Sequence, residues 1–161
     1  YGVALGAYEL AEMIKAGKSY AEVTARYQVL FSEPLVTFTL GDLKNLMRGG
    51  RLNKVQALFG TILRIKPIIE MIDGKLELVK KERTHLACIQ HFMDKIDYYT
   101  NKYEKVYLDV VNIHMDEAVN KLVESIKSKY KNLEIHMTNY LSPVFYSHLG
   151  NIGFGIGILT E

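Results

Sequence analysis

The sequence predicts a single layered α/β or α+β domain, in which helices flank a mixed β-sheet. Three observations lead to this prediction. Apolar residues recur at helical spacing in several segments, shorter runs alternate in polarity as strands do, and these segments follow one another without a linker or an internal repeat. The chain has 161 residues, 48% of them hydrophobic and 24% charged, which suffices for one hydrophobic core. Residues 1–161 are therefore expected to form one domain.

Two helices are expected at the front of the chain. Apolar residues repeat at helical spacing over residues 3–14, and Gly17 ends this first helix. Ser19 and Glu22 stand three residues apart and predict a capping box at the start of the second helix. Its apolar stripe runs over residues 20–30.

A strand and two further helices are expected next. Residues 35–40 follow Pro34 and alternate in polarity, which indicates a strand. A short helix around residues 43–47 ends at Gly49-Gly50. Asn53 is the expected N-cap of another helix, whose apolar face reaches Ile62.

A β-hairpin is expected over residues 65–82. The first strand covers residues 65–72, and Pro67 marks either an edge strand or the start of a strand. Asp73-Gly74 predicts a two-residue turn, because both residues tolerate positive φ. The partner strand runs out near Glu82.

The second half alternates helices and strands. Thr84 begins a long helix, and residues 106–111 form a mostly apolar run, which is typical of a strand buried on both faces. A helix is expected over residues 115–126, followed by strands over residues 133–137 and 154–158. The residues of the Thr84 helix expected to face the core are Leu86, Ile89, Met93 and Ile96.

Composition excludes several classes of function. The net charge is only +2, so nothing favours nucleic acid in general, and an anion site would have to be local. Cys88 is the single cysteine, so no intrachain disulfide can form and a cytoplasmic location is the expectation. No apolar run reaches 18 residues. The chain opens at Tyr1 without a methionine or a signal region, and we interpret it as a fragment of a longer protein.

The first segment with chemical potential is Arg48-Gly49-Gly50-Arg51-Leu52-Asn53. Paired glycines allow the backbone to approach a ligand closely, and an arginine beside a helix N-terminus favours an anion. The alternative is structural: Gly49 would be a helix C-cap and Arg51 a solvated side chain.

The second segment is Lys80-Lys81-Glu82-Arg83-Thr84-His85, a basic cluster where a strand meets a helix. It could receive a carboxylate or a phosphate, or it could be the charged face of an exposed hairpin. It also motivates a nucleic-acid-binding alternative, which the near-neutral charge opposes.

The third segment covers residues 147–157, with His148 at its entrance and four glycines in eight residues from Gly150 on. This composition suggests that the backbone packs closely against another group. The alternative is that His148 is a buried, hydrogen-bonded structural residue. An enzyme is the alternative function, with His148 as phosphoryl acceptor or general base beside Arg51. The other histidines (His85, His91, His114 and His136) are interpreted as surface or packing residues, so no metal site is expected.

These segments together resemble the DegV family of bacterial fatty-acid-binding proteins. The resemblance is carried by residues 39–83, TLGDLKNLMRGGRLNKVQALFGTILRIKPIIEMIDGKLELVKKER. The family's ordered motifs are matched by Gly49-Gly50-Arg51, Ile65-Lys66-Pro67, Asp73-Gly74 and Arg83. The segment at His148 looks like the family's C-terminal His-x-Gly-Pro-Gly motif, although Asn151 and Ile152 stand where the family usually has Pro-Gly.

The resemblance implies a lipid carrier rather than an enzyme. It implies a long-chain fatty acid as ligand, no cofactor, and a fatty acid kinase as the partner that converts the carboxylate to an acyl phosphate. A transient contact with a membrane surface and an N-terminal part with a Ser-Gly-x-Ser motif, absent from this chain, are also expected. His148 would contact the carboxylate, Arg51 and Arg83 would hold the anion or meet the kinase, and Gly49, Gly50 and Gly150 would form a glycine-rich mouth. The candidate tunnel residues are Leu40, Leu46, Leu58, Phe59, Ile62, Ile68 and Phe154.

Overall fold

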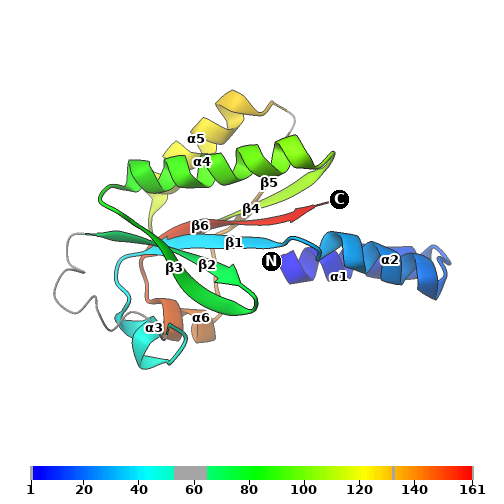
Figure 1. Ribbon diagram of the computed structural model, residues 1–161, viewed down its shortest axis with the longest axis horizontal. Coiled ribbons are helices and arrows are strands. Elements are labelled where there is room, and N and C mark those ends of the chain that lie inside the picture. The colour runs from blue at the N-terminus through cyan, green and yellow to red at the C-terminus, as the bar shows by residue number, and fades with distance from the viewer. Residues whose placement is uncertain (1, 53–64, 132, 161) are drawn as a thin grey trace.

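The computed structural model describes residues 2–52, 65–131 and 133–160 (Figure 1). The described elements are, in chain order, α1 (Gly2–Lys15), α2 (Tyr20–Leu30), β1 (Leu35–Leu40), α3 (Lys44–Arg48), β2 (Lys66–Ile72), β3 (Lys75–Glu82), α4 (His85–Lys102), β4 (Val106–Ile113), α5 (Asp116–Lys129), β5 (Ile135–Thr138), α6 (Pro143–Leu149) and β6 (Gly153–Thr160). The strands form a six-stranded sheet in the order β3-β2-β1-β6-β4-β5. The predicted α/β class with a mixed sheet is confirmed.

The sheet is antiparallel except for its last pair, β4 and β5, which are parallel. A parallel pair needs a long crossover connection, and α5 supplies it. The C-terminal strand β6 lies between β1 and β4, in a register that pairs Leu40 with Gly153. The end of β1 therefore lies beside the start of β6, which brings the segments around α3 and α6 to the same end of the sheet (Figure 1).

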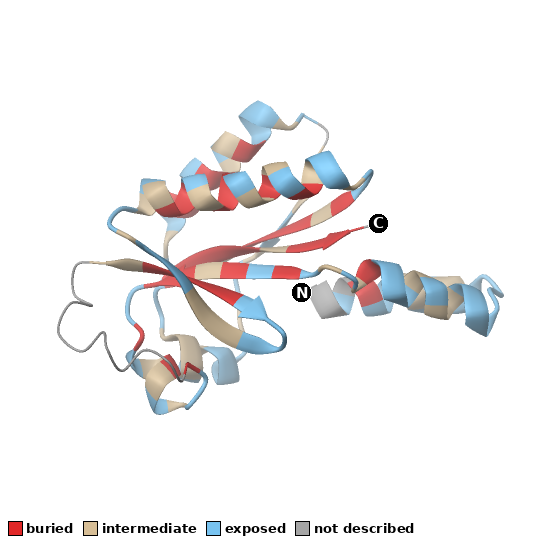
Figure 2. Ribbon diagram, viewed as in Figure 1, coloured by how far each residue is buried: buried red, intermediate tan, exposed pale blue. Residues whose placement is uncertain are grey.

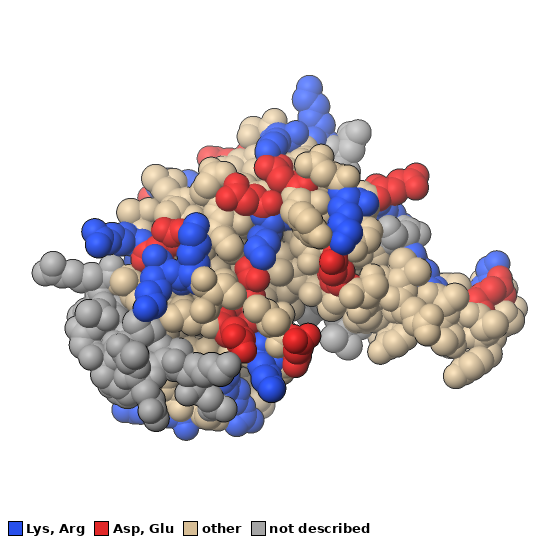
Figure 3. All heavy atoms as spheres, in the orientation of Figure 1, with Lys and Arg blue, Asp and Glu red and all other residues tan. Residues whose placement is uncertain are grey.

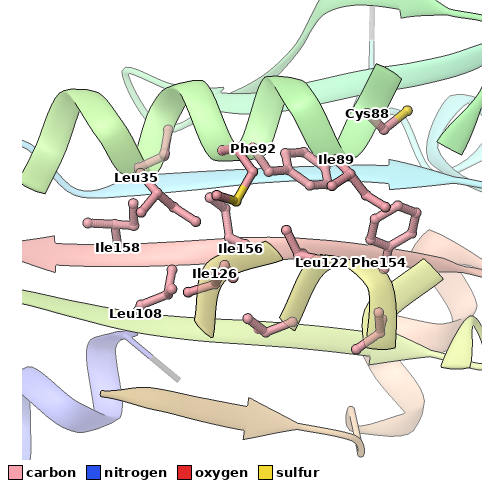
Figure 4. Packing of buried hydrophobic residues seen from close by; sticks show 14 of the residues in the cluster. Leu35, Cys88, Ile89, Phe92, Leu108, Leu122, Ile126, Phe154, Ile156 and Ile158 are labelled. Carbon is pink, nitrogen blue, oxygen red and sulfur yellow. The ribbon is translucent and has the colours of Figure 1, made fainter. Parts of the chain in front are cut away.

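Helices cover both faces of the sheet, with α4 and α5 on one side and α3 and α6 on the other (Figure 1). Because successive strand residues point to opposite faces, the buried residues divide into two clusters. We call the larger one the α4-side core; Figure 4 shows Phe92 of α4 meeting Phe154 of β6, with ring centroids 5.6 Å apart in an edge-to-face arrangement. The smaller one, the α3-side core, consists of the buried residues Leu40, Leu43, Leu46, Leu52 and Ile69.

The long helix α4 begins as predicted, with the Thr84 hydroxyl accepting a hydrogen bond from the backbone N–H of Ala87 at 3.1 Å. Three of its four predicted inward residues are buried, but the prediction for Leu86 was wrong, since this side chain is 65% exposed. At about 100° per residue, the inward line through Phe92 returns to position 85, not position 86. His85 therefore occupies the inward position at the first turn.

The hairpin between β2 and β3 turns where predicted. Asp73 (φ 49°) and Gly74 (φ 73°) both have positive φ, as a type I′ turn requires. Pro67 is the second residue of β2, which lies between β1 and β3. Of the two interpretations of this proline, the start of a strand is confirmed and the edge strand is wrong.

The prediction did not include one of the helices, and one helix that it did include cannot be compared with the structure. The helix α6 was not predicted, because its seven residues include no buried side chain and so carry no core-facing stripe; its signals are Ser142 at the N-cap and Pro143 in the first turn. The helix expected from Asn53 lies outside the described residues.

The helices α1 and α2 form a pair beside one end of the sheet, away from α3 and α6 (Figure 1). The capping box of α2 is confirmed: Ser19 donates its backbone N–H to Glu22 at 2.8 Å, and Glu22 donates its own to the Ser19 hydroxyl at 3.3 Å. The predicted apolar stripes are largely uncovered, with Ile14 63% and Tyr20 87% exposed (Figure 2). Among the described residues, no helix combines the length and apolar character needed to cross a membrane.

Candidate functional site

The candidate site forms where the end of α3 meets the end of α6. Gly49 is the C-cap of α3, and its backbone N–H donates to the Asn45 carbonyl at 2.9 Å. A Cβ placed on Gly49 would lie 2.7 Å from Nδ1 of His148, closer than side-chain carbons approach other atoms. The absence of a side chain at position 49 therefore leaves the space in which the His148 ring lies.

The other two predicted glycines are needed for different reasons. Gly50 has φ 67° with open space around it, so its requirement is a backbone conformation that other residues rarely adopt. Gly150 ends α6 with φ 82°, and a Cβ there would lie 3.3 Å from Nδ2 of Asn45. All three predicted glycines thus lie at the junction of α3 and α6.

Arg51 lies at the same junction. Its Nη1 donates a hydrogen bond to the Gly49 carbonyl at 2.7 Å, and its backbone N–H donates to the Leu46 carbonyl at 3.0 Å. The exposed guanidinium keeps further donors available for an anion. The helix C-cap at Gly49 and the exposed Arg51 of the structural interpretation are therefore both present, and the anion site at Gly49-Gly50-Arg51 stays a prediction.

His148 is half-buried and has no hydrogen bond or ion pair with any residue in the described ranges. Its neighbour Leu149 packs against the α3-side core. The imidazole is thus a donor or acceptor held next to apolar surface, an arrangement that can bind the polar head of an amphipathic ligand.

Arg83 is exposed in the connection between β3 and α4. No contact between Arg83 and either His148 or Arg51 is described. Within the same basic segment, Lys80 forms an ion pair with Glu82 at 2.7 Å, and this hydrogen bond raises the pKa of the Lys80 ammonium. Part of the positive charge is therefore compensated. Basic and acidic side chains are also interspersed over the face of the molecule shown in Figure 3.

The predicted tunnel residues that the structure describes belong to two different clusters. Leu46 belongs to the α3-side core and Ile68 to the α4-side core, so the sheet separates them. Leu40 and Phe154 both line a small cavity of about 50 Å³ at the end of the sheet. Leu58, Phe59 and Ile62 lie outside the described residues.

Other polar groups that the sequence did not single out are engaged in the fold. Glu70 is only 6% exposed and binds His91 and Lys95 of α4, each at 3.0 Å. Burial raises the pKa of this carboxyl, but hydrogen bonds from His91 and Lys95 outweigh it and hold the pKa below its usual value. Within the described ranges, no three His, Cys, Asp or Glu side chains are grouped to hold a metal ion.

The chain resembles known proteins over its whole length. A family model described as "Uncharacterised protein, DegV family" matches residues 1–161. A DegV domain-containing protein of Staphylococcus aureus (strain COL) is 30% identical over 165 residues, covering 100% of this chain and 57% of that protein. Protein DegV of Bacillus subtilis (strain 168) is 30% identical over 157 residues, covering 96% of this chain and 56% of that protein. The chain therefore spans just over half the length of these relatives.

Solved structures show the same fold. The crystal structure of DegV from Bacillus subtilis, described as a fatty acid binding protein, has a TM-score of 0.81 and 26% identity, with 99% of this chain and 57% of that chain covered. A fatty-acid-binding DegV family protein from Thermus thermophilus has a TM-score of 0.87 at 23% identity, with 99% and 57% covered. Since the family model covers every residue of the sequence, this chain belongs to the DegV family.

Proposed function

We propose that this chain, as part of a longer protein, binds a long-chain fatty acid whose carboxylate lies beside His148. The observation that carries the proposal is the space that Gly49 leaves for the His148 ring, next to the guanidinium of Arg51. Relatives described as fatty acid binding proteins support it, because they share the fold at the same coverage.

A fatty acid has an apolar tail and a charged carboxylate, and the junction of α3 and α6 offers an apolar surface and polar side chains for them. A tail of about 15 methylenes gains on the order of 12 kcal/mol from burial before entropic costs. The carboxylate would cost free energy if it were buried without partners, and His148 and Arg51 supply donors for it. The α3-side core, which Leu149 borders, offers the adjoining apolar surface.

We further propose that the protein presents this carboxylate to a fatty acid kinase, which transfers a phosphoryl group to it and forms an acyl phosphate. The chemistry belongs to the kinase, and this protein is the carrier, with the fatty acid as ligand and no cofactor. Arg83, exposed before α4, is proposed to contact the kinase rather than the carboxylate. A further N-terminal region of the same protein would complete the pocket, and a cytoplasmic location with transient membrane contact fits this role.

An enzyme that uses His148 as its base has less support. A catalytic histidine is ordinarily oriented by a second group, often a carboxylate. Among the described residues, none binds the His148 ring in this way, whereas His91 and His136 each pair with a buried carboxylate, Glu70 and Asp109 respectively.

The proposal is tested by native mass spectrometry and lipid extraction on the protein purified from bacteria, with His148→Ala as the comparison. We expect a copurified long-chain fatty acid in the unmodified protein and a reduced amount in the variant. His136→Ala, at an exposed histidine of the edge strand β5, is the matched control and should retain the lipid. The longer protein, folded but carrying no fatty acid, would refute the carrier function.

A further inference from the structure

A second group of polar side chains lines a small cavity at one end of the sheet, beside the first turn of α4. The cavity of about 50 Å³ lies where β1 ends and where β2 and β6 begin. Its walls are apolar or glycine except for three residues, Thr39, Lys66 and His85. The three come from β1, β2 and the first turn of α4, so the sheet order brings them together.

Thr39 contributes a buried donor without a partner. The residue is 2% exposed, and its hydroxyl has no hydrogen-bond partner within the described part of the chain. The thiol of Cys88 is near enough for this hydroxyl to lower its pKa against the larger, raising effect of burial, but the two groups do not form a well-aligned hydrogen bond. Thr37 and Thr160 also carry unpartnered buried hydroxyls, yet only Thr39 of the three lines a described cavity. An unpartnered buried hydroxyl costs free energy that a ligand oxygen would recover.

Lys66 and His85 contribute a charge and a second donor. Lys66 has no ion pair within the described ranges. Burial lowers the pKa of His85 and the positive charge of Lys66 lowers it further, against the opposing charge of Glu117, so the balance favours the neutral imidazole, which donates one N–H. His85 is also the first residue of the 18-residue helix α4, whose N-terminal end carries a partial positive charge.

An outer cavity of about 310 Å³ adjoins this site and shares His85 and Met115 with it. Its two acidic side chains both have partners, although the charge of Glu117 still raises the pKa of His85. Glu117 forms an ion pair with Lys121 at 2.7 Å, and Asp116 accepts a hydrogen bond from Asn112 at 2.6 Å. Among the described residues, the inner cavity is thus lined by one charged side chain, the ammonium of Lys66, whereas the outer cavity has charges of both signs.

We propose that Thr39, Lys66 and His85 form an interior site for a small oxyanion, namely a carboxylate or phosphate group. One buried water needs about 10–15 Å³, so the inner cavity has room for a group of roughly three or four non-hydrogen atoms. Such an oxyanion satisfies all three polar side chains at once. The site is separate from His148 and goes beyond the proposed function, although the head group of a bound fatty acid and a free anion are both sources of this chemistry.

To test the proposal, NMR measures the pKa of His85 in the lipid-free protein while sodium phosphate, sodium acetate or palmitate is added. Methyl palmitate is the uncharged comparison. A bound anion raises the pKa of His85, because a nearby negative charge favours the imidazolium. Lys66→Met removes the charge from the site, and Lys75→Met, at an exposed lysine in the hairpin, is the matched control.

We expect at least one anion to raise the pKa of His85 in the unmodified protein and in Lys75→Met, and to do so at roughly tenfold or higher concentration in Lys66→Met. A response to phosphate or acetate assigns the site to a free anion. A response to palmitate but not to its methyl ester assigns it to the head group. If phosphate raises the pKa of His85 and palmitate does not, the oxyanion site stands as a site for a free anion, and the proposed fatty acid function, whose carboxylate lies beside His148, is decided separately by lipid extraction.

The site is overturned if none of the anions changes the pKa of His85, or if Lys66→Met responds as the unmodified protein does. Thr39→Val provides a second variant of unchanged shape, should Lys66→Met fail to fold. It removes the unpartnered hydroxyl, so we expect a higher thermal midpoint together with roughly tenfold weaker anion binding. Anion binding by Thr39→Val as tight as that of the unmodified protein would also contradict the proposal.

Discussion

Gly49 and the His148 ring occupy one shared space: a Cβ at position 49 would lie 2.7 Å from Nδ1 of His148 and 3.2 Å from the Asn45 carbonyl. The backbone at Gly49 is ordinary, with φ −76°, so any residue could adopt its conformation. Glycine is therefore required there for room alone. This relationship joins two glycine-rich segments that lie far apart in the sequence, and it gives the candidate site its geometry.

Gly49→Ala is expected to displace the His148 ring. The substitution should weaken fatty acid binding severalfold and destabilise the fold by about 1–3 kcal/mol, as overpacking usually does. Urea unfolding and a fatty acid titration on the same sample measure both effects.

Gly50→Ala is the control for this experiment. Nothing lies within 4 Å of the new methyl group, but φ is 67°, so the cost should be backbone strain of about 1 kcal/mol. Fatty acid affinity should stay close to that of the unmodified protein. Equal losses of affinity in the two variants would show that displacement of His148 is not the cause.

Glu70 is expected to matter for stability in acid. Its folded-state pKa lies below the unfolded value, so its contribution is present above the unfolded pKa of about 4.5 and is lost as the pH falls through the folded pKa. Glu70→Ala should lower the free energy of unfolding by about 1–3 kcal/mol at neutral pH, because Lys95 remains partly solvated. Urea unfolding at several pH values measures this, with Glu124→Ala on the exposed side of α5 as the control.

His85 is expected to make the free energy of unfolding rise with pH, whereas a histidine paired with a carboxylate makes it fall. Its folded-state pKa is lowered, so the unfolded chain takes up a proton first as the pH falls through about 6.5. The free energy of unfolding should therefore decrease below that pH and level off below the folded pKa. His85→Gln should remove this decrease below about pH 6.5, whereas His114→Gln should preserve it.

The helix α2 is expected to depend on its capping box. Hydrogen bonds from the backbone and side chain of Ser19 lower the pKa of Glu22 to about 2, so the box persists in moderate acid. Ser19→Ala should destabilise the helix by about 0.5–2 kcal/mol, measured as faster amide hydrogen exchange over α2. Ser32→Ala, beyond the other end of α2, should leave the first turn unchanged.

The elements that the sequence predicted well are those with local causes. The capping box joins Ser19 to a residue three positions away, and the turn at Asp73-Gly74 depends on the φ angles of two neighbouring residues. Leu86 shows the limit of this reasoning. An apolar stripe predicts which residues can face a core, but the packing of α4 on the sheet decided that His85 faces it instead.

The candidate site could be predicted only in part for the same reason. The association of Gly49 with His148 followed from the family motifs rather than from spacing, because nothing local indicates that α3 meets α6. The sequence could not show that Leu46 and Ile68 belong to different cores, since the face on which a side chain lies depends on strand register. The oxyanion site is formed by three elements that the sheet order brings together.

The most direct test of the account is a calorimetric titration of the lipid-free protein with palmitate and with hexadecanol, which has the same chain length and no charge. We predict that the unmodified protein binds palmitate at least about tenfold more tightly than hexadecanol, and that His148→Gln reduces this preference while binding hexadecanol equally well. No binding of either ligand by the folded longer protein, which includes the region proposed to complete the pocket, would contradict the fatty acid carrier function. A palmitate affinity of the His148→Gln variant equal to that of the unmodified protein would contradict the proposed position of the carboxylate beside His148.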